Sequence, residues 1–239
     1  MKRYQKLIIL IILSLSVILI YNKENKNTKT YLVLGDSLAV GINSYGGVTY
    51  GYDKFFKDYL EKDEKINIIT NYTSRNKDIK SIKNDILENK TYIINNNNYN
   101  IRKLLSESEI ITLSIGVNDI IYEYNLTNKE SLTQYEENKI VDYIYINMKD
   151  LVKSIRKYTQ KPIYIIGYPE NTKKYKSIIK KLNNKYKQIS DNCIFINISE
   201  ELSNSKYYDL ENSMYPNVEG YKKIADLILE KYKIYENKR

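Results

Sequence analysis

A serine at the end of the first predicted strand is the residue best placed for nucleophilic chemistry. The segment Gly35-Asp36-Ser37-Leu38 directly follows the apolar run 31–34, and Gly41 comes four residues after the serine. A serine at a strand-to-helix turn exposes its hydroxyl at the sheet edge, near a helix amino terminus whose dipole favours developing negative charge. The same tetrapeptide also fits a helix N-cap without any chemistry. Ser37 alone therefore does not indicate an enzyme.

Two later segments add polar groups that fit a nucleophilic serine. Gly116-Val117-Asn118-Asp119 directly follows the apolar run 110–115, and Tyr215-Pro216-Asn217 opens the last segment of helical period. The Asn118 amide, at the end of a strand, is a candidate donor to an oxyanion held beside Ser37. Proline and asparagine at a helix start have a structural explanation of their own. The three segments, in this order at the mouth of one predicted sheet, carry more weight than any one of them.

On these segments the chain resembles the SGNH/GDSL hydrolases, a family of esterases and acylhydrolases, over about residues 30 to 235. The resemblance implies that Ser37 is the nucleophile and that Asn118 is an oxyanion donor, with Asp119 as a structural neighbour. The second block of the family supplies a backbone N–H from a glycine after the second strand, but residues 71–76 contain no glycine. Asn76 is the best match, because asparagine tolerates positive φ better than other non-glycine residues.

The last block departs from the family pattern. Family members carry D-x-x-H-P, with histidine as the base and aspartate as its orienter, whereas Asn212 and Tyr215 stand at these positions, and the chain contains no histidine. A tyrosine phenol, with a reference pKa of about 10, is a poor base near pH 7, and a neutral amide cannot stabilise an imidazolium. Other candidate bases are Asp119, Asp209, Glu211 or a lysine of lowered pKa, and the sequence does not select among them.

Three hypotheses follow. The favoured one is a catalytically impaired hydrolase that binds an ester, acyl or glycan ligand in the inherited cleft. An oxyanion hole alone leaves a residual acceleration of roughly 10³–10⁴-fold, which is compatible with weak esterase activity. The alternative is an active Ser37-dependent esterase that acts on envelope lipid or O-acylated polysaccharide through a base other than histidine. A purely structural scaffold is the third.

The amino terminus has the features of a membrane-targeting segment. Residues 7–20 consist of Leu, Ile and Val with two serines, and Lys2, Arg3 and Lys6 precede them. Fourteen helical residues span about 21 Å, less than a hydrocarbon core of roughly 30 Å, so the segment resembles a signal-peptide core in length. The residues after it, Tyr21 to Glu24, lack the small side chains of a cleavage site. We therefore expect an uncleaved signal-anchor, with cleavage near residue 25 as the alternative.

The basic residues at the amino end place that end in the cytoplasm and the remainder outside it. The predicted organisation is a membrane segment at 1–21, a polar tether at 22–29 and one hydrolase-like domain at 30–239. The expected location is the cell membrane, crossed once, with the domain extracytoplasmic, or secreted if the segment is cleaved. The expected partners are the membrane, through residues 7–20, and an ester, acyl or cell-envelope glycan ligand.

The elements that must position these residues alternate between short strands and longer helices. The predicted strands are mostly apolar, as in strands buried on both faces of a parallel sheet, and lie at 31–34, 66–69, 110–115, 163–166 and 194–198. Apolar residues spaced three and four apart predict helices across 141–155, 175–186 and 218–228. The pattern favours a three-layer α/β/α sandwich with a five-stranded doubly wound parallel sheet. Residues 93–100, with four consecutive asparagines, are interpreted as a surface loop.

Composition excludes several classes of function. The chain has a formal net charge of +9, but its lysines are spread along it without an RNA- or DNA-binding motif, so we expect no nucleic-acid partner. We expect no cofactor, because neither a P-loop nor a dinucleotide-binding motif is present. One cysteine and no histidine exclude a structural zinc site.

Overall fold

A five-stranded parallel sheet forms the centre of the domain. The computed structural model describes residues 28–94 and 97–238, so the predicted membrane segment 7–20 lies outside the described residues. In spatial order the strands are β2 (Lys65–Thr73), β1 (Thr28–Gly35), β5 (Ile110–Ser114), β6 (Ile163–Ile166) and β7 (Cys193–Ile196), each parallel to its neighbours. This order confirms the predicted doubly wound sheet. Strand order reverses between β1 and β5, the place where such sheets form their sites.

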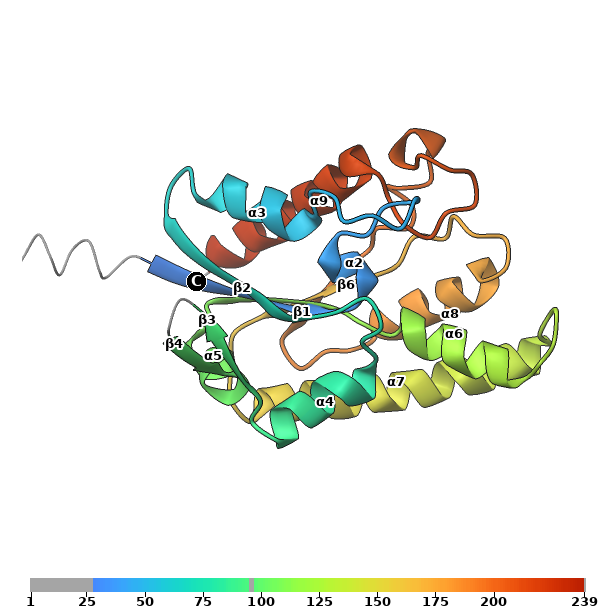
Figure 1. Cartoon of the computed structure of the whole chain (residues 1–239), viewed down its shortest axis with the longest axis horizontal. Helices are drawn as coiled ribbons and strands as arrows, with labels where there is room; N and C mark the ends of the chain where they lie inside the picture. Colours follow the sequence, from blue (N-terminus) through green and yellow to red (C-terminus); the bar gives the residue numbers. More distant parts are fainter. Residues whose placement is uncertain (1–27, 95–96, 239) are drawn as a thin grey trace, which may run out of the picture.

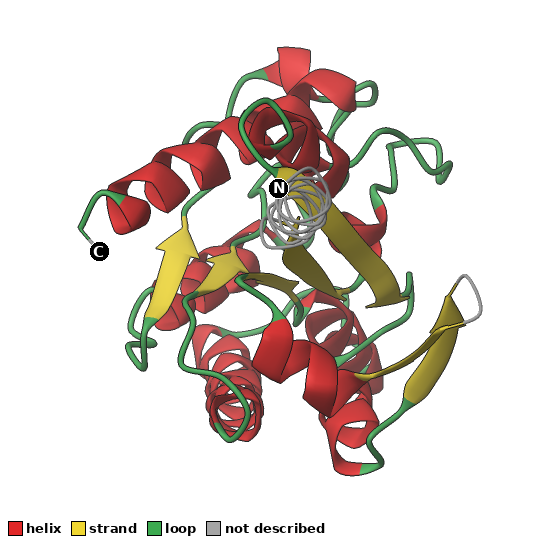
Figure 2. Ribbon diagram, turned by 90° about the vertical axis from the view of Figure 1, so that its left-hand side faces the viewer, coloured by secondary structure: helices red, strands yellow, loops and turns green. Residues whose placement is uncertain are grey.

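Helices cover both faces of the sheet and complete the three layers (Figures 1 and 2). One face carries α3 (Tyr52–Leu60) and α9 (Val218–Glu236), which pack against each other. The other face carries α4 (Ile79–Leu87), α5 (Ile101–Glu107), α7 (Gln134–Arg156) and α8 (Lys176–Tyr186), with α6 (Val117–Leu126) packed on α7 and α8. Two short elements, α2 (Ser37–Val40) and the 3-10 helix η1 (Ser205–Tyr207), lie in the loops.

The apolar patterns of the sequence account for the core. Every residue of β5 and β6 is buried, because helices cover both of their faces. The predicted stripe of α7, from Val141 to Ile155, is at most 1% exposed at each of its five positions. The stripes of α8 and α9 are buried in the same way, at Ile178, Ile179 and Leu182 and at Tyr221, Ile224 and Ile228. The three predicted helices are therefore confirmed.

The interpretation of residues 93–100 as a loop is wrong. Thr91–Ile94 (β3) and Asn97–Asn100 (β4) form an antiparallel hairpin outside the main sheet (Figure 2). Tyr92 pairs with Tyr99 across it, and the hydroxyl of Tyr72 donates to the carbonyls of Lys90 and Tyr99. These tyrosine contacts anchor a segment whose asparagines alone favour turns.

Two further observations concern the predicted tether and membrane-spanning helices. The first strand begins at Thr28, inside the stretch interpreted as a tether. Among residues 28–94 and 97–238, no helix has both the length and the apolar character needed to cross a membrane.

Candidate active site

The three sequence segments singled out for chemistry meet at the carboxyl edge of the sheet. Gly35 ends β1 and Ser37 begins α2, while Gly116 and Asn118 follow β5, the neighbour of β1. The backbone N–H of Asp36 donates to the carbonyl of Ser114 at 2.9 Å, which ties the two strand ends together. The segment that precedes α9 reaches the same edge, because the Ser44 hydroxyl donates to the Tyr215 carbonyl at 3.0 Å.

Glycine at position 35 is required by this close approach. Gly35 has φ +152°, and a Cβ added there would lie 2.3 Å from the carbonyl oxygen of Ser114. Only glycine lets β1 pass this close to the end of β5 before the chain turns into α2.

Ser37 is the first residue of α2 and is only 2% exposed. Its Oγ is inaccessible to solvent and has no hydrogen-bond partner within the described part of the chain. A nucleophilic serine is normally activated by a base within hydrogen-bond reach, about 2.6–3.2 Å away. Among residues 28–94 and 97–238, no such group hydrogen-bonds to the Ser37 hydroxyl.

Asp36 positions α2 from a fully buried site. Its Oδ1 accepts from the Leu38 N–H at 3.0 Å, as an N-cap, and its Oδ2 accepts from the hydroxyl of Tyr168. Burial raises the pKa of Asp36 to about 7, although the bonds from Tyr168 and Leu38 act in the opposite direction. Burial also raises the pKa of Tyr168 well above its usual value, so that its hydroxyl stays protonated and donates.

Asn118 and Asp119 hold the loop that follows β2. The Asn118 Nδ2 donates to the carbonyls of Arg75 and Lys77, both at 2.8 Å, and Asp119 Oδ2 accepts from the Ile79 N–H at 3.3 Å. Burial and the nearby Asp78 raise the pKa of Asp119 to about 6. Both protons of the Asn118 amide are thus used by backbone carbonyls of this loop.

Asn76 lies in this loop and is exposed. The expectation that it uses left-handed backbone is wrong, because Asn76 is not among the described residues with positive φ. Its backbone N–H makes no backbone hydrogen bond in the described structure. It therefore stays a candidate donor, without the conformational argument for asparagine.

The residues at the family's acid and base positions have structural roles. Asn212 is exposed in a turn with φ 60°, a conformation that asparagine tolerates well. Tyr215 is partly buried, and its backbone is held by the Ser213 hydroxyl, which bonds both its N–H and its carbonyl at 3.0 Å. The Tyr215 side chain makes no hydrogen bond within the described structure, so nothing there couples it to Ser37.

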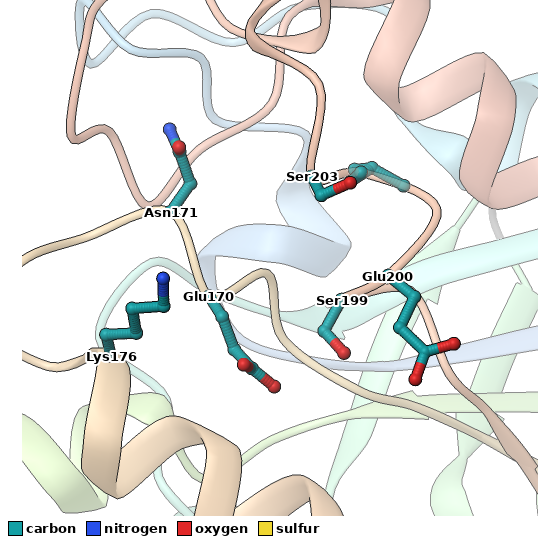
Figure 3. A pocket seen from close by; sticks show the side chains of 7 residues that line it. Glu170, Asn171, Lys176, Ser199, Glu200 and Ser203 are labelled. Atoms are coloured by element: carbon teal, nitrogen blue, oxygen red, sulfur yellow. The ribbon is translucent and has the colours of Figure 1, made fainter.

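A cavity of about 240 Å³ opens at the same edge, between the loops that follow β6 and β7 (Figure 3). Its lining is mostly polar, formed by Glu170, Asn171, Lys176, Ser199, Glu200, Leu202 and Ser203. Asn171 Nδ2 donates to the Ser213 carbonyl at 3.2 Å, so one wall of the cavity contacts the segment that contains Asn212 and Tyr215.

Sequence reasoning missed Tyr168. It lies two residues after the fourth predicted strand, much as Ser37 and Asn118 each lie three residues after a predicted strand. A tyrosine at that place has no recognised chemistry, so its contact with Asp36 could not be anticipated. Among the described residues, no group of three or more Cys, Asp or Glu is arranged to hold a metal ion.

Comparisons with known proteins agree with this fold. A family model described as GDSL-like Lipase/Acylhydrolase matches residues 31–228. No curated protein matches the chain. Among solved structures, a lipase from a goat rumen metagenome superposes with a TM-score of 0.70 at 17% identity, covering 84% of this chain and 96% of that one. At this identity the likeness shows a shared fold.

Two further structures share the fold. The lipase/acylhydrolase of Enterococcus faecalis has a TM-score of 0.59 at 14% identity, and covers 86% of this chain and 95% of its own. A family 3 carbohydrate esterase of Clostridium thermocellum has a TM-score of 0.55 at 16% identity, with 85% and 94% covered.

Proposed function

The chain belongs to the GDSL-like lipase/acylhydrolase family, and from this premise we propose that it is a catalytically impaired member that holds an ester, acyl or glycan ligand near Ser37. The observation that carries the proposal is the state of Ser37. Its hydroxyl is buried and unpaired in the described structure, and Asn212 and Tyr215 stand where the family has its acid and base. Without a base to accept its proton, a serine hydroxyl attacks an ester slowly at neutral pH.

The hydrogen bonds of the Asn118 amide also support catalytic impairment. An oxyanion donor stabilises the transition state only if its N–H points to where negative charge develops. Here both amide protons donate to the carbonyls of Arg75 and Lys77. Transition-state stabilisation by this side chain would require breaking one of these bonds, which lowers its contribution to the rate.

We further propose that the domain is extracytoplasmic and anchored by residues 7–20. The support comes from the sequence, namely basic residues followed by an apolar segment without a cleavage site. The strand β1 begins at Thr28 on the edge of the sheet opposite Ser37 (Figure 1).

One observation favours a second candidate, an active esterase with a carboxylate base. Asp36 precedes Ser37 in the chain, and Asp119 lies close enough to Asp36 to raise its pKa. The pKa values of the two carboxyl groups are raised to about 7 and about 6. A base whose pKa lies close to the working pH is more effective than an ordinary carboxylate. In this candidate one of them accepts the Ser37 proton as the hydroxyl attacks the ester carbonyl. Asp36 would first have to exchange a present partner, Tyr168 or Leu38, for Ser37.

Hydrolysis of a short activated ester by the full-length chain, compared with Ser37→Ala from pH 5 to pH 9, tests both candidates. Impairment predicts equal rates, or a wild-type rate that exceeds the variant by a small factor. A carboxylate base predicts a Ser37-dependent rate that rises with pH through about 6 to 7, because the base must be ionised. A large Ser37-dependent rate would overturn the proposal of impairment.

A further inference from the structure

The cavity beside the candidate site carries unneutralised charges of both signs. Lys176, the first residue of α8, extends its amine from one side, and the carboxylates of Glu170 and Glu200 lie across from it (Figure 3). Within residues 28–94 and 97–238, none of these three groups forms a salt bridge, although thirteen other pairs do. Lys176 and Glu200 are exposed, and Glu170 Oε1 accepts from Asn183 Nδ2 at 3.4 Å, so a ligand would compete with water and with this amide for the three charges.

The uncharged part of the lining adds hydrogen-bonding groups. The hydroxyl of Ser199 lies between Glu170 and Glu200, Ser203 lies above them in Figure 3, and Leu202 is the one apolar side chain in the lining. Hydrogen bonds to a charged group are roughly twice as strong as those between neutral groups. The chemistry that fits best is a molecule with a cationic end and an anionic end.

Both walls of this cavity are connected to the candidate site. Tyr168, two residues before Glu170, donates to Asp36, the residue that precedes Ser37. Asn171 donates to the carbonyl of Ser213, two residues before Tyr215. The ribbon of α2 lies behind the cavity in Figure 3. A ligand in the cavity thus lies next to the segments that position Ser37 and Tyr215.

We propose that this cavity binds a small zwitterionic group, an ammonium joined to a phosphate or carboxylate, as the polar head of the ligand. The ammonium lies against Glu170 and Glu200, and the anion lies against Lys176. A volume of about 240 Å³ is below the roughly 300–1,000 Å³ of pockets for drug-sized ligands, so it suits a head group alone. This inference rests on the proposed function only in assigning the ester end of the same ligand to Ser37.

The test measures binding of four soluble probes to the full-length chain in detergent micelles by titration calorimetry and ligand-observed NMR. Glycerophosphoethanolamine and γ-aminobutyrate carry both charges, with a phosphate and a carboxylate respectively. Ethanolamine and glycerol phosphate carry one charge each. We expect at least one zwitterion to bind ten or more times more tightly than either singly charged probe. Tighter binding of glycerophosphoethanolamine indicates a ligand whose anion is a phosphate, and tighter binding of γ-aminobutyrate indicates a carboxylate.

Charge-neutralising variants locate the site. Glu200→Gln and Lys176→Gln each weaken binding of the zwitterion about fivefold, whereas Glu88→Gln and Lys180→Gln, at exposed positions outside the cavity lining, leave it unchanged. Equal affinity for all four probes, or equal loss in the control variants, would overturn the proposal.

Ser37→Ala separates this inference from the proposed function. If the wild type and Ser37→Ala both bind the zwitterion, the proposed cavity site is supported. If the wild type in addition neither binds nor hydrolyses esters, the proposed role of Ser37 in holding a ligand is contradicted. Ester binding without zwitterion binding contradicts the cavity and leaves the role of Ser37 intact.

Discussion

Tyr168 donates a hydrogen bond to the buried carboxyl of Asp36, across 132 positions of the chain. This contact joins the loop after β6 to the residue that caps α2 and precedes Ser37. Because Asp36 is inaccessible to solvent and Tyr168 is almost completely buried, water hardly competes for this bond. The orientation of Ser37 therefore depends on a tyrosine from a distant segment.

Tyr168→Phe tests this dependence. The substitution leaves Asp36 Oδ2 without its donor, which we expect to lower the free energy of unfolding by about 1.5–3 kcal/mol, as for hydrogen bonds to charged groups. The loss is larger above pH 7 than below it, because the Tyr168 hydroxyl favours the ionised carboxylate. Urea denaturation at pH 5 and pH 8 measures both effects. Equal stability of wild type and variant at both values would contradict a hydrogen bond in solution.

Asp36 predicts an unusual pH dependence of stability. Its pKa rises from 3.8 to about 7 on folding, so the folded state binds more protons than the unfolded state between these values. The free energy of unfolding therefore falls as pH increases from about 4 to 7, by on the order of 4 kcal/mol from this group alone. Asp119, raised to about 6, acts in the same direction. In Asp36→Asn this decline becomes shallower, as denaturant melts across this range would show, whereas Asp209→Asn, at an exposed site, keeps it.

Gly35→Ala is expected to be among the most destabilising single-methyl changes in the domain. The added Cβ would meet the Ser114 carbonyl oxygen at 2.3 Å, at a φ of +152°. Strain and overpacking together cost about 3 kcal/mol or more. Gly47→Ala is the matched control, because its nearest contact is the Asn43 side chain at 3.5 Å. Thermal melts that place the two variants within a degree of each other would rule out the close approach of β1 and β5.

Asn118→Ala distinguishes a positioning role from direct contact with a ligand. Loss of the bonds to the Arg75 and Lys77 carbonyls should loosen the loop between β2 and α4. We expect faster amide hydrogen exchange at residues 75–78, with exchange in β5 and α7 unchanged. Asp119→Asn retains an acceptor for the Ile79 N–H and serves as the control. Unchanged exchange in the loop of Asn118→Ala would show that the amide does not hold it.

The sequence predicts the strands that position this site better than it predicts the hydrogen bonds within the site. The strands were predictable because residues buried on both faces leave apolar runs such as 110–115. Ser37 and Asn118 stand out because each lies three residues after such a run. The direction of the Asn118 amide was not predictable, since it depends on the conformation of the loop after β2. Helices α3, α4, α5 and α6 are not predicted from the sequence, and the hairpin of β3 and β4 is mistaken for a loop. Its asparagines dominate the composition, whereas the tyrosine contacts that anchor it come in part from Tyr72, outside the hairpin.

Restoring the family's acid and base is the most direct test of why Ser37 lacks activation. In Asn212→Asp with Tyr215→His, the imidazole gains a carboxylate partner, and aspartate, like asparagine, tolerates the φ of 60° at position 212. If impairment comes from the missing pair, the double variant should hydrolyse an activated ester roughly 10²–10⁴ times faster than wild type. The gain should disappear in the triple variant with Ser37→Ala, and the rate should increase with pH around 6.5, where a histidine loses its proton. Tyr215→Phe with Asn212→Asp controls for changes in the loop. A folded double variant with no Ser37-dependent gain would mean that burial of the Ser37 hydroxyl or the occupied Asn118 amide, and not the absent base, limits hydrolysis.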